Sequence, residues 1–339
     1  MNNYYYPHAF ELENGEVLQE LNIGFSTFGK LNADKSNVIW ICHALTANAD
    51  VTDWWPGLVG QHQIIDPEKY FIVCANIVGS CYGSTGPQSI NPQTHQPYLN
   101  NFPLITIRDM VHAHILLRKY LLIDKIFLLI GGSMGGYQTM EWSIMEKEVI
   151  ENLFLLATSA RETAWGIATH TAQRLCIEAD SSWQEPTTNA GANGLKAARA
   201  VGMLTYRNYG IFVQQQSDED AEKLDGFKAS SYINHQGDKL TKRFNAMSYW
   251  WLTKSMDSHN ISRSRNASIE NILKTISQKT LIIGISSDHL CPVIEQEFLA
   301  KNLPNATFKI INSDYGHDGF LVEHKQIAAA LSGWLQNIL

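Results

Sequence analysis

KIFLLIGGSMGGYQTMEW, residues Lys125–Trp142, is the stretch of sequence that decides the fold. It begins with an apolar run, Lys125–Ile130, passes through a glycine-rich turn, and continues into a segment of helical composition, Met134–Lys147. A short apolar run bounded by turn residues is typical of a strand that is buried on both faces of a parallel sheet. The stretch therefore predicts a buried strand, a tight turn and a helix.

Apolar runs of the same kind recur along the chain, at Val38–Cys42, Tyr70–Ala75, Leu153–Ala157, Thr280–Ile285 and Thr307–Ile311. Helical patterns alternate with these runs. Thr106 can cap a helix that runs to Leu122, and Gly319–Leu339 has the pattern of an amphipathic terminal helix. Strands that alternate with helices predict an α/β fold with a mostly parallel, doubly wound sheet.

Residues 160–270 break this alternation, because they contain no strand-like run and include helical pieces such as Gly194–Tyr206. We therefore expect an α/β core made of residues 1–159 and 271–339, with a mostly helical lid inserted at 160–270. Within the insertion, residues 181–193 are rich in turn formers and are the segment most expected to be a flexible loop.

The composition limits the classes of function. The 339 residues are 45% hydrophobic, which excludes wholesale disorder. Twenty-six basic residues against 33 acidic ones give a net charge of −7, and no basic run is present, so nucleic acid and anionic membranes are poor candidates for partners.

The cysteines and the N-terminal sequence indicate a compartment. The five cysteines are widely spaced and form no CxxC pair, which argues against a disulfide framework or a zinc site. The N-terminal sequence has no pattern of a signal peptide, and no apolar stretch approaches the length of a membrane span. We expect a soluble, cytoplasmic protein without a metal.

Gly131-Gly132-Ser133-Met134-Gly135 matches the G-x-S-x-G pattern of a nucleophile elbow. The match follows a predicted strand directly and precedes a predicted helix, which is the context that such an elbow requires. Glycines on both sides allow a turn that is too tight for a β-carbon. The sequence therefore predicts Ser133 as a nucleophile at the N-terminus of a helix, where backbone N–H groups favour an oxyanion.

A serine nucleophile needs a histidine base that a carboxylate orients. His317 follows the last predicted strand in a glycine-containing loop, and Asp288 follows the strand before it. The order Ser133, Asp288, His317 is the order expected for a nucleophile on such an elbow. We predict these three residues as the catalytic triad, with Asp314 as the alternative acid.

Two backbone N–H groups are predicted to form the oxyanion hole. One belongs to Met134, directly after the nucleophile, and the other to Leu45, in the loop that follows the strand Val38–Cys42. The glycine-rich segment Gly79–Pro87 also follows a strand, but it lacks the lysine of a phosphate-binding loop. We interpret it as a wall of the pocket and expect no nucleotide site there.

Six ordered blocks together resemble the homoserine O-acetyltransferase family, whose members are α/β-hydrolase-fold acyltransferases. The blocks are CHALTANAD (Cys42–Asp50), WWPGLVG (Trp54–Gly60), NIVGSCYGSTGP (Asn76–Pro87), TIRDMV (Thr106–Val111), GGSMGGYQTMEW (Gly131–Trp142) and YGHDGFLVE (Tyr315–Glu323). The resemblance spans almost the whole chain and weakens in the helical insertion.

The resemblance implies an activity and a set of partners. Family members transfer the acetyl group of acetyl-CoA, a co-substrate, to the hydroxyl of L-homoserine through an acyl-serine in methionine biosynthesis, without a further cofactor. It implies a homodimer formed through the lid helices. It also implies that Arg199 holds the carboxylate of the amino acid and that Tyr206 and Asp318 line the same pocket.

Other activities share these blocks. Relatives that use succinyl-CoA, or that use serine as the acceptor, share the same six blocks. A serine esterase also forms the same acyl-enzyme and differs only in that water resolves it. These alternatives stay open at the level of the sequence.

Overall fold

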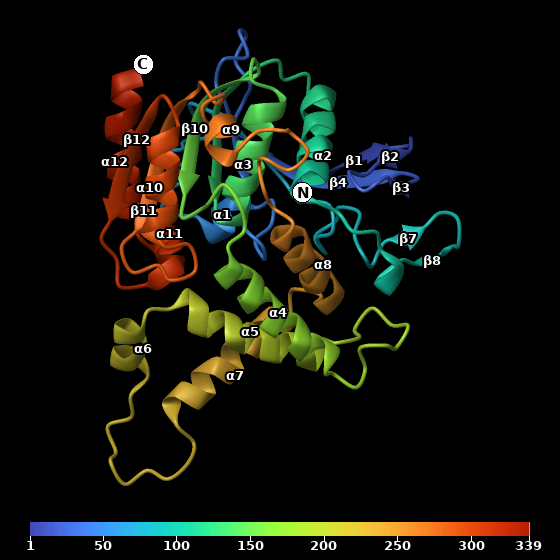
Figure 1. Ribbon diagram of the computed structural model, residues 1–339, viewed down its shortest axis with the longest axis vertical. Helices are drawn as coiled ribbons and strands as arrows, with labels where there is room; N and C mark the ends of the chain where they lie inside the picture. The colour runs from blue at the N-terminus through green and yellow to red at the C-terminus, as the bar shows by residue number, and fades with distance from the viewer. Residues whose placement is uncertain (339) are drawn as a thin grey trace.

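The computed structural model describes residues 1–338, and an eight-stranded sheet forms its centre (Figure 1). The strand order is β1-β4-β6-β5-β9-β10-β11-β12; β1 and β4 pair antiparallel, β4 and β6 pair antiparallel, and every other pair is parallel. Strands of the sheet are β1 (Asn2–Tyr6), β4 (Leu21–Phe28), β5 (Val38–Cys42), β6 (Phe71–Ala75), β9 (Ile126–Gly132), β10 (Ile150–Leu156), β11 (Lys279–Ile285) and β12 (Ala306–Ile311). Two small hairpins lie outside it, β2 (Phe10–Glu11) with β3 (Val17–Leu18), and β7 (Ile90–Asn91) with β8 (Gln96–Pro97).

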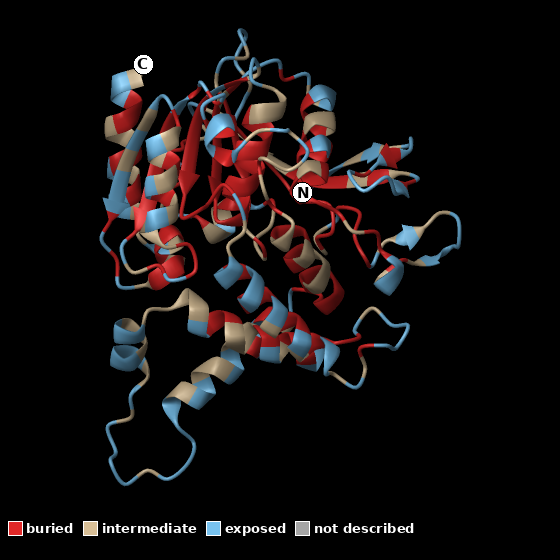
Figure 2. Cartoon of the chain, in the orientation of Figure 1, coloured by how far each residue is buried: buried red, intermediate tan, exposed pale blue. Residues whose placement is uncertain are grey.

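Alternation along the strands explains why both faces of the sheet are buried. In β5, Val38, Trp40 and Cys42 belong to one apolar core, whereas Ile39 and Ile41 belong to the core on the opposite face. Successive side chains of a strand point to opposite faces, so a continuous apolar run supplies both cores. Figure 2 shows the result: the inner strands of the sheet are red with buried residues, whereas the edge strand β12 is largely pale blue.

Helices cover both faces and also form the region below the sheet in Figure 1. Residues of α2, α3 and α9 contribute to the first core, and those of α1 and α12 contribute to the second. The helices are α1 (Val51–Trp54), α2 (Ile107–Tyr120), α3 (Met134–Met145), α4 (Ala164–Glu178), α5 (Ala192–Tyr206), α6 (Tyr209–Gln216), α7 (Lys228–Thr241), α8 (Ala246–Asp257), α9 (Ile269–Leu273), α10 (Val293–Asn302), α11 (Gly319–Val322) and α12 (His324–Ile338), with short 3₁₀ turns at Leu99–Asn101 and Gly316–Asp318.

The predicted, mostly parallel sheet is confirmed, and each of the six apolar runs matches one of its strands to within one residue at either end, except that β9 and β10 extend further. Strands β1 and β4 were not predicted, because neither contains a continuous apolar run. Strand β1 has the polar and aromatic sequence NNYYY at the edge of the sheet, and β4, LNIGFSTF, has polar residues between its apolar ones. The prediction of one terminal helix over Gly319–Leu339 is wrong. The helix breaks at Glu323, whose backbone leaves the helical region, and Leu339 lies outside the described residues.

Between β10 and β11 the described chain forms helices α4 to α9 and no strand of the sheet. Helix α5 packs against α4 and α7, and α8 packs against α4. Residues 181–191 of the predicted 181–193 loop form turns, whereas its last two residues already belong to α5, which begins at Ala192. The segment between α6 and α7 is largely exposed (Figure 2). The division into a core and a lid domain at residues 160 and 270 stays a prediction. No helix in residues 1–338 combines the length and the apolar character needed to cross a membrane.

Candidate active site

Ser133 lies in the turn between β9 and α3 and has a left-handed backbone, with φ of 54°. A residue other than glycine adopts this conformation only where the surroundings enforce it. Here Ser133 N–H donates to Leu156 O (3.0 Å), and Thr158 Oγ1 donates to Ser133 O (2.8 Å). A β-carbon on Gly135 would lie 2.1 Å from the carbonyl oxygen of Cys42, so only glycine lets α3 approach β5 this closely.

The three predicted triad residues meet in one chain of hydrogen bonds. His317 Nε2 lies 2.9 Å from Ser133 Oγ, and His317 Nδ1 lies 2.6 Å from Asp288 Oδ2. All three side chains are buried. Such spacing allows the imidazole to take the proton of the hydroxyl while the carboxylate fixes the tautomer. The alternative acid, Asp314, is exposed and is not part of this chain.

Asp288 is held by its own loop. Its Oδ1 accepts hydrogen bonds from the backbone N–H groups of Leu290 (2.8 Å) and Cys291 (2.9 Å), which leaves Oδ2 for His317. Burial alone would lower the pKa of His317, but the charge and the hydrogen bond of Asp288 outweigh it, and Asp318 adds to the same effect. The pKa of His317 therefore lies above its ordinary value of 6.5.

The predicted oxyanion loop lies beside the nucleophile. Leu45 and Ser133 line the same cavity, and the N–H group of Leu45 makes no hydrogen bond to another residue within positions 1–338. Met134 is the first residue of α3, where a backbone N–H has no partner inside the helix. Both N–H groups are therefore free to donate to a ligand oxygen.

Two buried side chains that the sequence analysis did not select support this loop. Ile77 N–H donates to His43 Nε2 (3.3 Å), so that Nδ1 carries the proton and donates to Ala44 O (2.9 Å). Gln138 Nε2 donates both to His43 O (3.2 Å) and to Met134 O (3.3 Å), which ties the loop to the start of α3. Burial lowers the pKa of His43 to about 4, so its ring is neutral in this role.

The site opens into a cavity of about 410 Å³ between the core and the helices that follow β10. Residues from both regions line it, among them Leu45, Ser133, Arg199, Tyr206, His317 and Asp318. The cavity thus brings all three predicted acceptor-binding residues next to the triad. The base loop also touches the helical region, since a β-carbon on Gly316 would lie 2.6 Å from the carbonyl oxygen of Tyr206.

Arg199 and Tyr206 form one side of the cavity. The Arg199 guanidinium lies 5.3 Å from the centre of the Tyr206 ring, which in turn lies 6.0 Å from the ring of His317. Arg199 forms no ion pair within residues 1–338, and its buried Nε has no hydrogen-bond partner there. A buried, unpartnered guanidinium donor beside the nucleophile is suited to an anionic ligand.

Asp318 has a cationic partner that the sequence analysis missed. Arg207 Nε lies 3.2 Å from Asp318 Oδ2, at the end of α5. Burial raises the pKa of Asp318, whereas Arg207 and Arg199 act to lower it. Arg207 and Asp318 are far apart in the sequence, with 110 residues between them, and no local motif connects them. Only the folded structure brings the two side chains together.

A second histidine faces the cavity from α4. His170 Nδ1 lies 2.9 Å from Asp257 Oδ1, and the other oxygen of Asp257 accepts from Arg174 (2.6 Å). His170 is buried and lines the cavity with Met256. This cluster joins α4 to α8, and it provides one polar group in the cavity wall on the side of the helices.

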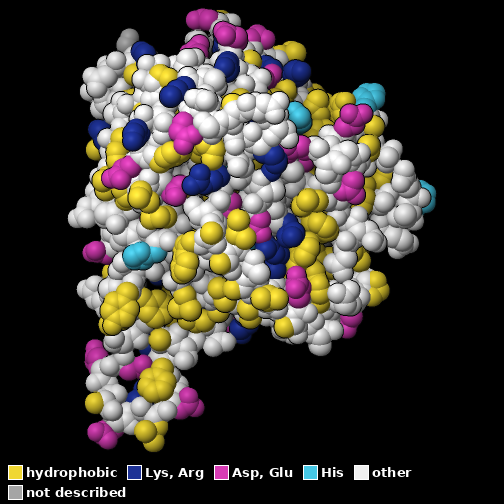
Figure 3. All heavy atoms as spheres, in the orientation of Figure 1, with side chains coloured by type: hydrophobic (Ala, Val, Ile, Leu, Met, Phe, Trp, Pro, Cys, Tyr) yellow, Lys and Arg dark blue, Asp and Glu magenta, His cyan; other side chains and the backbone are white. Residues whose placement is uncertain are grey.

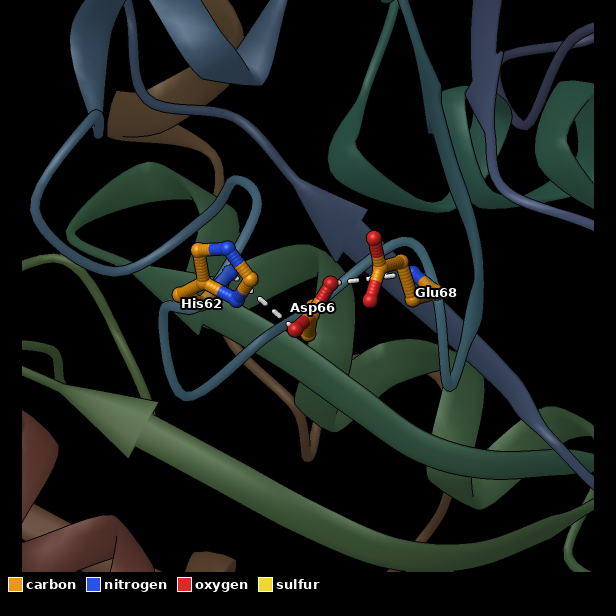
Figure 4. A group of neighbouring side chains, drawn as sticks. All are labelled: His62, Asp66 and Glu68. Carbon is orange, nitrogen blue, oxygen red and sulfur yellow. Dashed lines mark hydrogen bonds between the residues drawn. The ribbon is translucent and has the colours of Figure 1, made fainter.

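His62, Asp66 and Glu68 are the one group of described residues whose side chains are spaced to hold a metal ion (Figure 4). The Asp66 carboxylate, however, already accepts the backbone N–H groups of His62 (3.0 Å) and Glu68 (2.9 Å). These two hydrogen bonds lower the pKa of Asp66, and the bond from Glu68 has the larger effect. Hydrogen bonds that close a loop explain the cluster without an ion, and the group is separate from the cavity lined by Ser133.

The raised pKa of His317 predicts the pH dependence of acylation. The base must be neutral to accept a proton, so the acylation rate should rise with pH through a midpoint above 6.5. In Asp318→Asn the negative charge is lost and the cation Arg207 is left unpaired, so the midpoint should move to lower pH. The initial burst with p-nitrophenyl acetate, followed from pH 5 to 9, measures it.

Asp314→Asn is the matched control for this shift. Asp314 is an exposed carboxylate of the same loop and is absent from the groups that raise the pKa of His317. Its substitution should leave the midpoint in place. An unchanged midpoint in Asp318→Asn would contradict the electrostatic account.

Comparisons with known proteins agree with the geometry. Residues 37–324 match the family model of the alpha/beta hydrolase fold. The homoserine O-acetyltransferase of Cyclobacterium marinum is 47% identical over 98% of this chain and 95% of its own length. Among solved structures, a homoserine O-acetyltransferase from Bacillus anthracis has a TM-score of 0.88 at 23% identity, over 97% of this chain and 96% of its own.

An esterase has the same fold to the same degree. Esterase E22 has a TM-score of 0.88 at 22% identity and covers 98% of this chain and 99% of its own. Structural likeness at this level of identity shows the fold alone, so the assignment depends on the curated relative. By its sequence and its fold, the chain belongs to the homoserine O-acetyltransferase family of α/β-hydrolase-fold enzymes.

Proposed function

We propose that this protein transfers the acetyl group of acetyl-CoA to the hydroxyl of L-homoserine, as a step of methionine biosynthesis, through an acyl-Ser133 intermediate. One observation carries the proposal. The hydrogen-bonded residues Ser133, His317 and Asp288 lie at a cavity walled by helices, in a protein that is 47% identical to a homoserine O-acetyltransferase.

Acylation is the first half-reaction. His317 Nε2 takes the proton of Ser133 as Oγ attacks the thioester carbonyl, and the N–H groups of Leu45 and Met134 donate to the oxyanion that forms. The carbon–sulfur bond then breaks, and His317 returns the proton to the departing thiolate of CoA. Ser133 is left as an acetyl ester, and His317 is neutral again.

Transfer to the acceptor is the second half-reaction. His317 takes the proton of the homoserine hydroxyl, whose oxygen attacks the acetyl ester. Collapse of the tetrahedral intermediate breaks the bond to Ser133 Oγ, which regains the proton from His317. Water has to be kept from the same position, and the helices that wall the cavity support this exclusion.

Recognition of the acceptor is assigned to three residues. An amino acid carries a carboxylate and an ammonium, and a buried site must pair both charges because their desolvation costs several kcal/mol per ion. We assign the carboxylate to Arg199 and the ammonium to Asp318, with Tyr206 forming the wall between them. Because Asp318 already faces Arg207, it would share its charge between that side chain and the ammonium.

Intact mass spectrometry tests the proposed function. The protein mixed with acetyl-CoA alone should gain one acetyl group on Ser133, and L-homoserine should discharge it as O-acetylhomoserine. Ser133→Ala should gain none, because triad substitutions reduce rates by about 10⁴-fold or more. Rapid release of free acetate without an acceptor would identify an esterase instead. Faster reaction with succinyl-CoA or L-serine would identify the other donor or acceptor.

Arg199→Leu should separate the two half-reactions. Loss of a charge-assisted hydrogen bond, about 1.5–3 kcal/mol, predicts a fall in kcat/KM for homoserine of roughly 10- to 150-fold. Acylation of Ser133 by p-nitrophenyl acetate should be almost unchanged, since no amino acid takes part in it. Lys196→Leu, one turn earlier on α5 and paired with Asp238, is the matched control and should alter neither half-reaction.

If Arg199→Leu slowed both half-reactions equally, the assignment of Arg199 to the carboxylate of the acceptor would be wrong. That result would place Arg199 in the structure of the cavity wall rather than in recognition of the carboxylate.

We further propose a homodimer formed through the helices that follow β10. Large apolar side chains are exposed on three of these helices: Trp165 (57%), Leu175 (59%), Leu204 (67%) and Tyr209 (81%). Figure 3 shows hydrophobic side chains gathered over this part of the molecule. Apolar surface of this kind supports a protein interface. Sedimentation equilibrium at micromolar concentration should return twice the mass of the chain, and a monomer would contradict the proposal.

Two expectations accompany this function. Acetyl-CoA acts as a co-substrate, so the steps above require no resident cofactor, and a biosynthetic enzyme of this kind is proposed to work in the cytoplasm.

A further inference from the structure

A small second cavity of about 80 Å³ adjoins the active-site cavity at the side of the helices. Its lining consists of Arg199, Gln236, Lys239, Leu240 and Arg243, and no carboxylate is among them. Arg199, Lys239 and Arg243 line both cavities, so three cations mark the place where the two cavities meet.

The cations at this junction have no anionic partners. Neither Lys239 nor Arg243 lies within ion-pair distance of a carboxylate in residues 1–338, whereas Lys196 on the neighbouring helix α5 pairs with Asp238 at 2.8 Å. The acidic lining residues of the larger cavity are Asp53 and Asp318, the second of which is paired with Arg207. Unpaired positive charge therefore faces the open part of the cavity.

Arg243 is held in position by the core. Its guanidinium donates to the carbonyl oxygen and to the hydroxyl of Thr46, and to the hydroxyl of Tyr82 (2.9 Å). Thr46 follows Leu45 in the oxyanion loop. At least one N–H group of the fork is left without a bond to the protein, so the cation is oriented but not saturated.

We propose that Lys239 and Arg243 bind the phosphate groups of the acyl-CoA donor. The inference rests on the proposed function, because it names the part of the site that would hold acetyl-CoA outside the reacting thioester. The acceptor amino acid has no net charge, but the nucleotide end of CoA carries several negative charges on phosphates. Lys and Arg side chains are the groups that bind phosphate in proteins.

The shape of the site supports this placement. The thioester has to reach Ser133, and a cavity of about 410 Å³ is too small for a complete acyl-CoA, whose bulk exceeds that of the drug-sized ligands that fill cavities of 300–1,000 Å³. Apolar side chains such as Met256, Leu290 and Phe320 line the cavity and suit the uncharged pantetheine arm. The nucleotide must then remain near the mouth, where Lys239 and Arg243 are exposed.

Acylation kinetics with two donors test the proposal. Acetyl-CoA carries the phosphates, and S-acetyl-pantetheine presents the same thioester without charge. Lys239→Ala should reduce the acylation kcat/KM for acetyl-CoA by roughly 5- to 30-fold, as expected for a charge-assisted contact that solvent partly screens. It should leave the value for S-acetyl-pantetheine unchanged. Raising the salt concentration should reduce the difference between wild type and Lys239→Ala.

Lys242→Ala is the matched control, because Lys242 is an exposed cation three positions along and lines neither cavity. It should leave both donors unaffected. Arg243→Ala should lower the rate with acetyl-CoA more than the rate with S-acetyl-pantetheine, although loss of the contact with Thr46 is expected to reduce both.

Two results would overturn the inference. One is an unchanged reaction of Lys239→Ala with acetyl-CoA, and the other is an equal loss with both donors, which would indicate a structural role. Failure of the proposed function looks different, because the wild-type protein itself would then gain no acetyl group from acetyl-CoA. If the wild-type protein is acetylated but Lys239→Ala shows no selective loss with acetyl-CoA, the proposed phosphate site is wrong while the proposed function stands.

Discussion

The close approach of α3 to the end of β5 is the contact on which the active site depends. It is possible only because Gly135 has no β-carbon, which would lie 2.1 Å from the carbonyl oxygen of Cys42. Ser133, two residues before Gly135, has a left-handed backbone, and the loop that follows β5 lines the same cavity. This close approach thus accompanies the placement of the predicted nucleophile beside the two N–H groups predicted for the oxyanion hole. Gln138 then locks the two elements by bonding to a carbonyl of each.

Two of the buried histidines, His43 and His317, differ in their electrostatic surroundings. Burial lowers the pKa of His43 to about 4, and both ring nitrogens are hydrogen-bonded to backbone groups, so that it serves as a fixed neutral support. His317 is equally buried, but Asp288 offsets the effect of burial and raises its pKa. The same residue type therefore serves as a neutral support at one position and is suited to proton transfer at the other, and the difference is the neighbouring carboxylates, Asp288 first and Asp318 second.

The sequence predicted the triad because each member belongs to a short, ordered signal: an elbow after a strand, an acid after a later strand, and a histidine in the last loop. Residues that act through the fold gave no such signal. Gln138 and His43 have ordinary helix and loop contexts, and Arg207 meets Asp318 only in three dimensions. The edge strand β1 escaped detection for a related reason, since an edge position does not require an apolar run.

The residues proposed for chemistry and those proposed for recognition come from different parts of the chain. Ser133, Asp288 and His317 all follow strands of the sheet, whereas Arg199, Lys239 and Arg243 all belong to the helical region between β10 and β11. An esterase shares the fold with a TM-score of 0.88, so the sheet by itself does not specify transfer to an amino acid. If the helices supply the charges for both donor and acceptor, substitutions in α5 and α7 can change the substrates without disturbing the triad. The loop of His317 and the end of α5 meet where Gly316 packs against the carbonyl of Tyr206. A substitution in α5 that moved this carbonyl would therefore also change the position of His317.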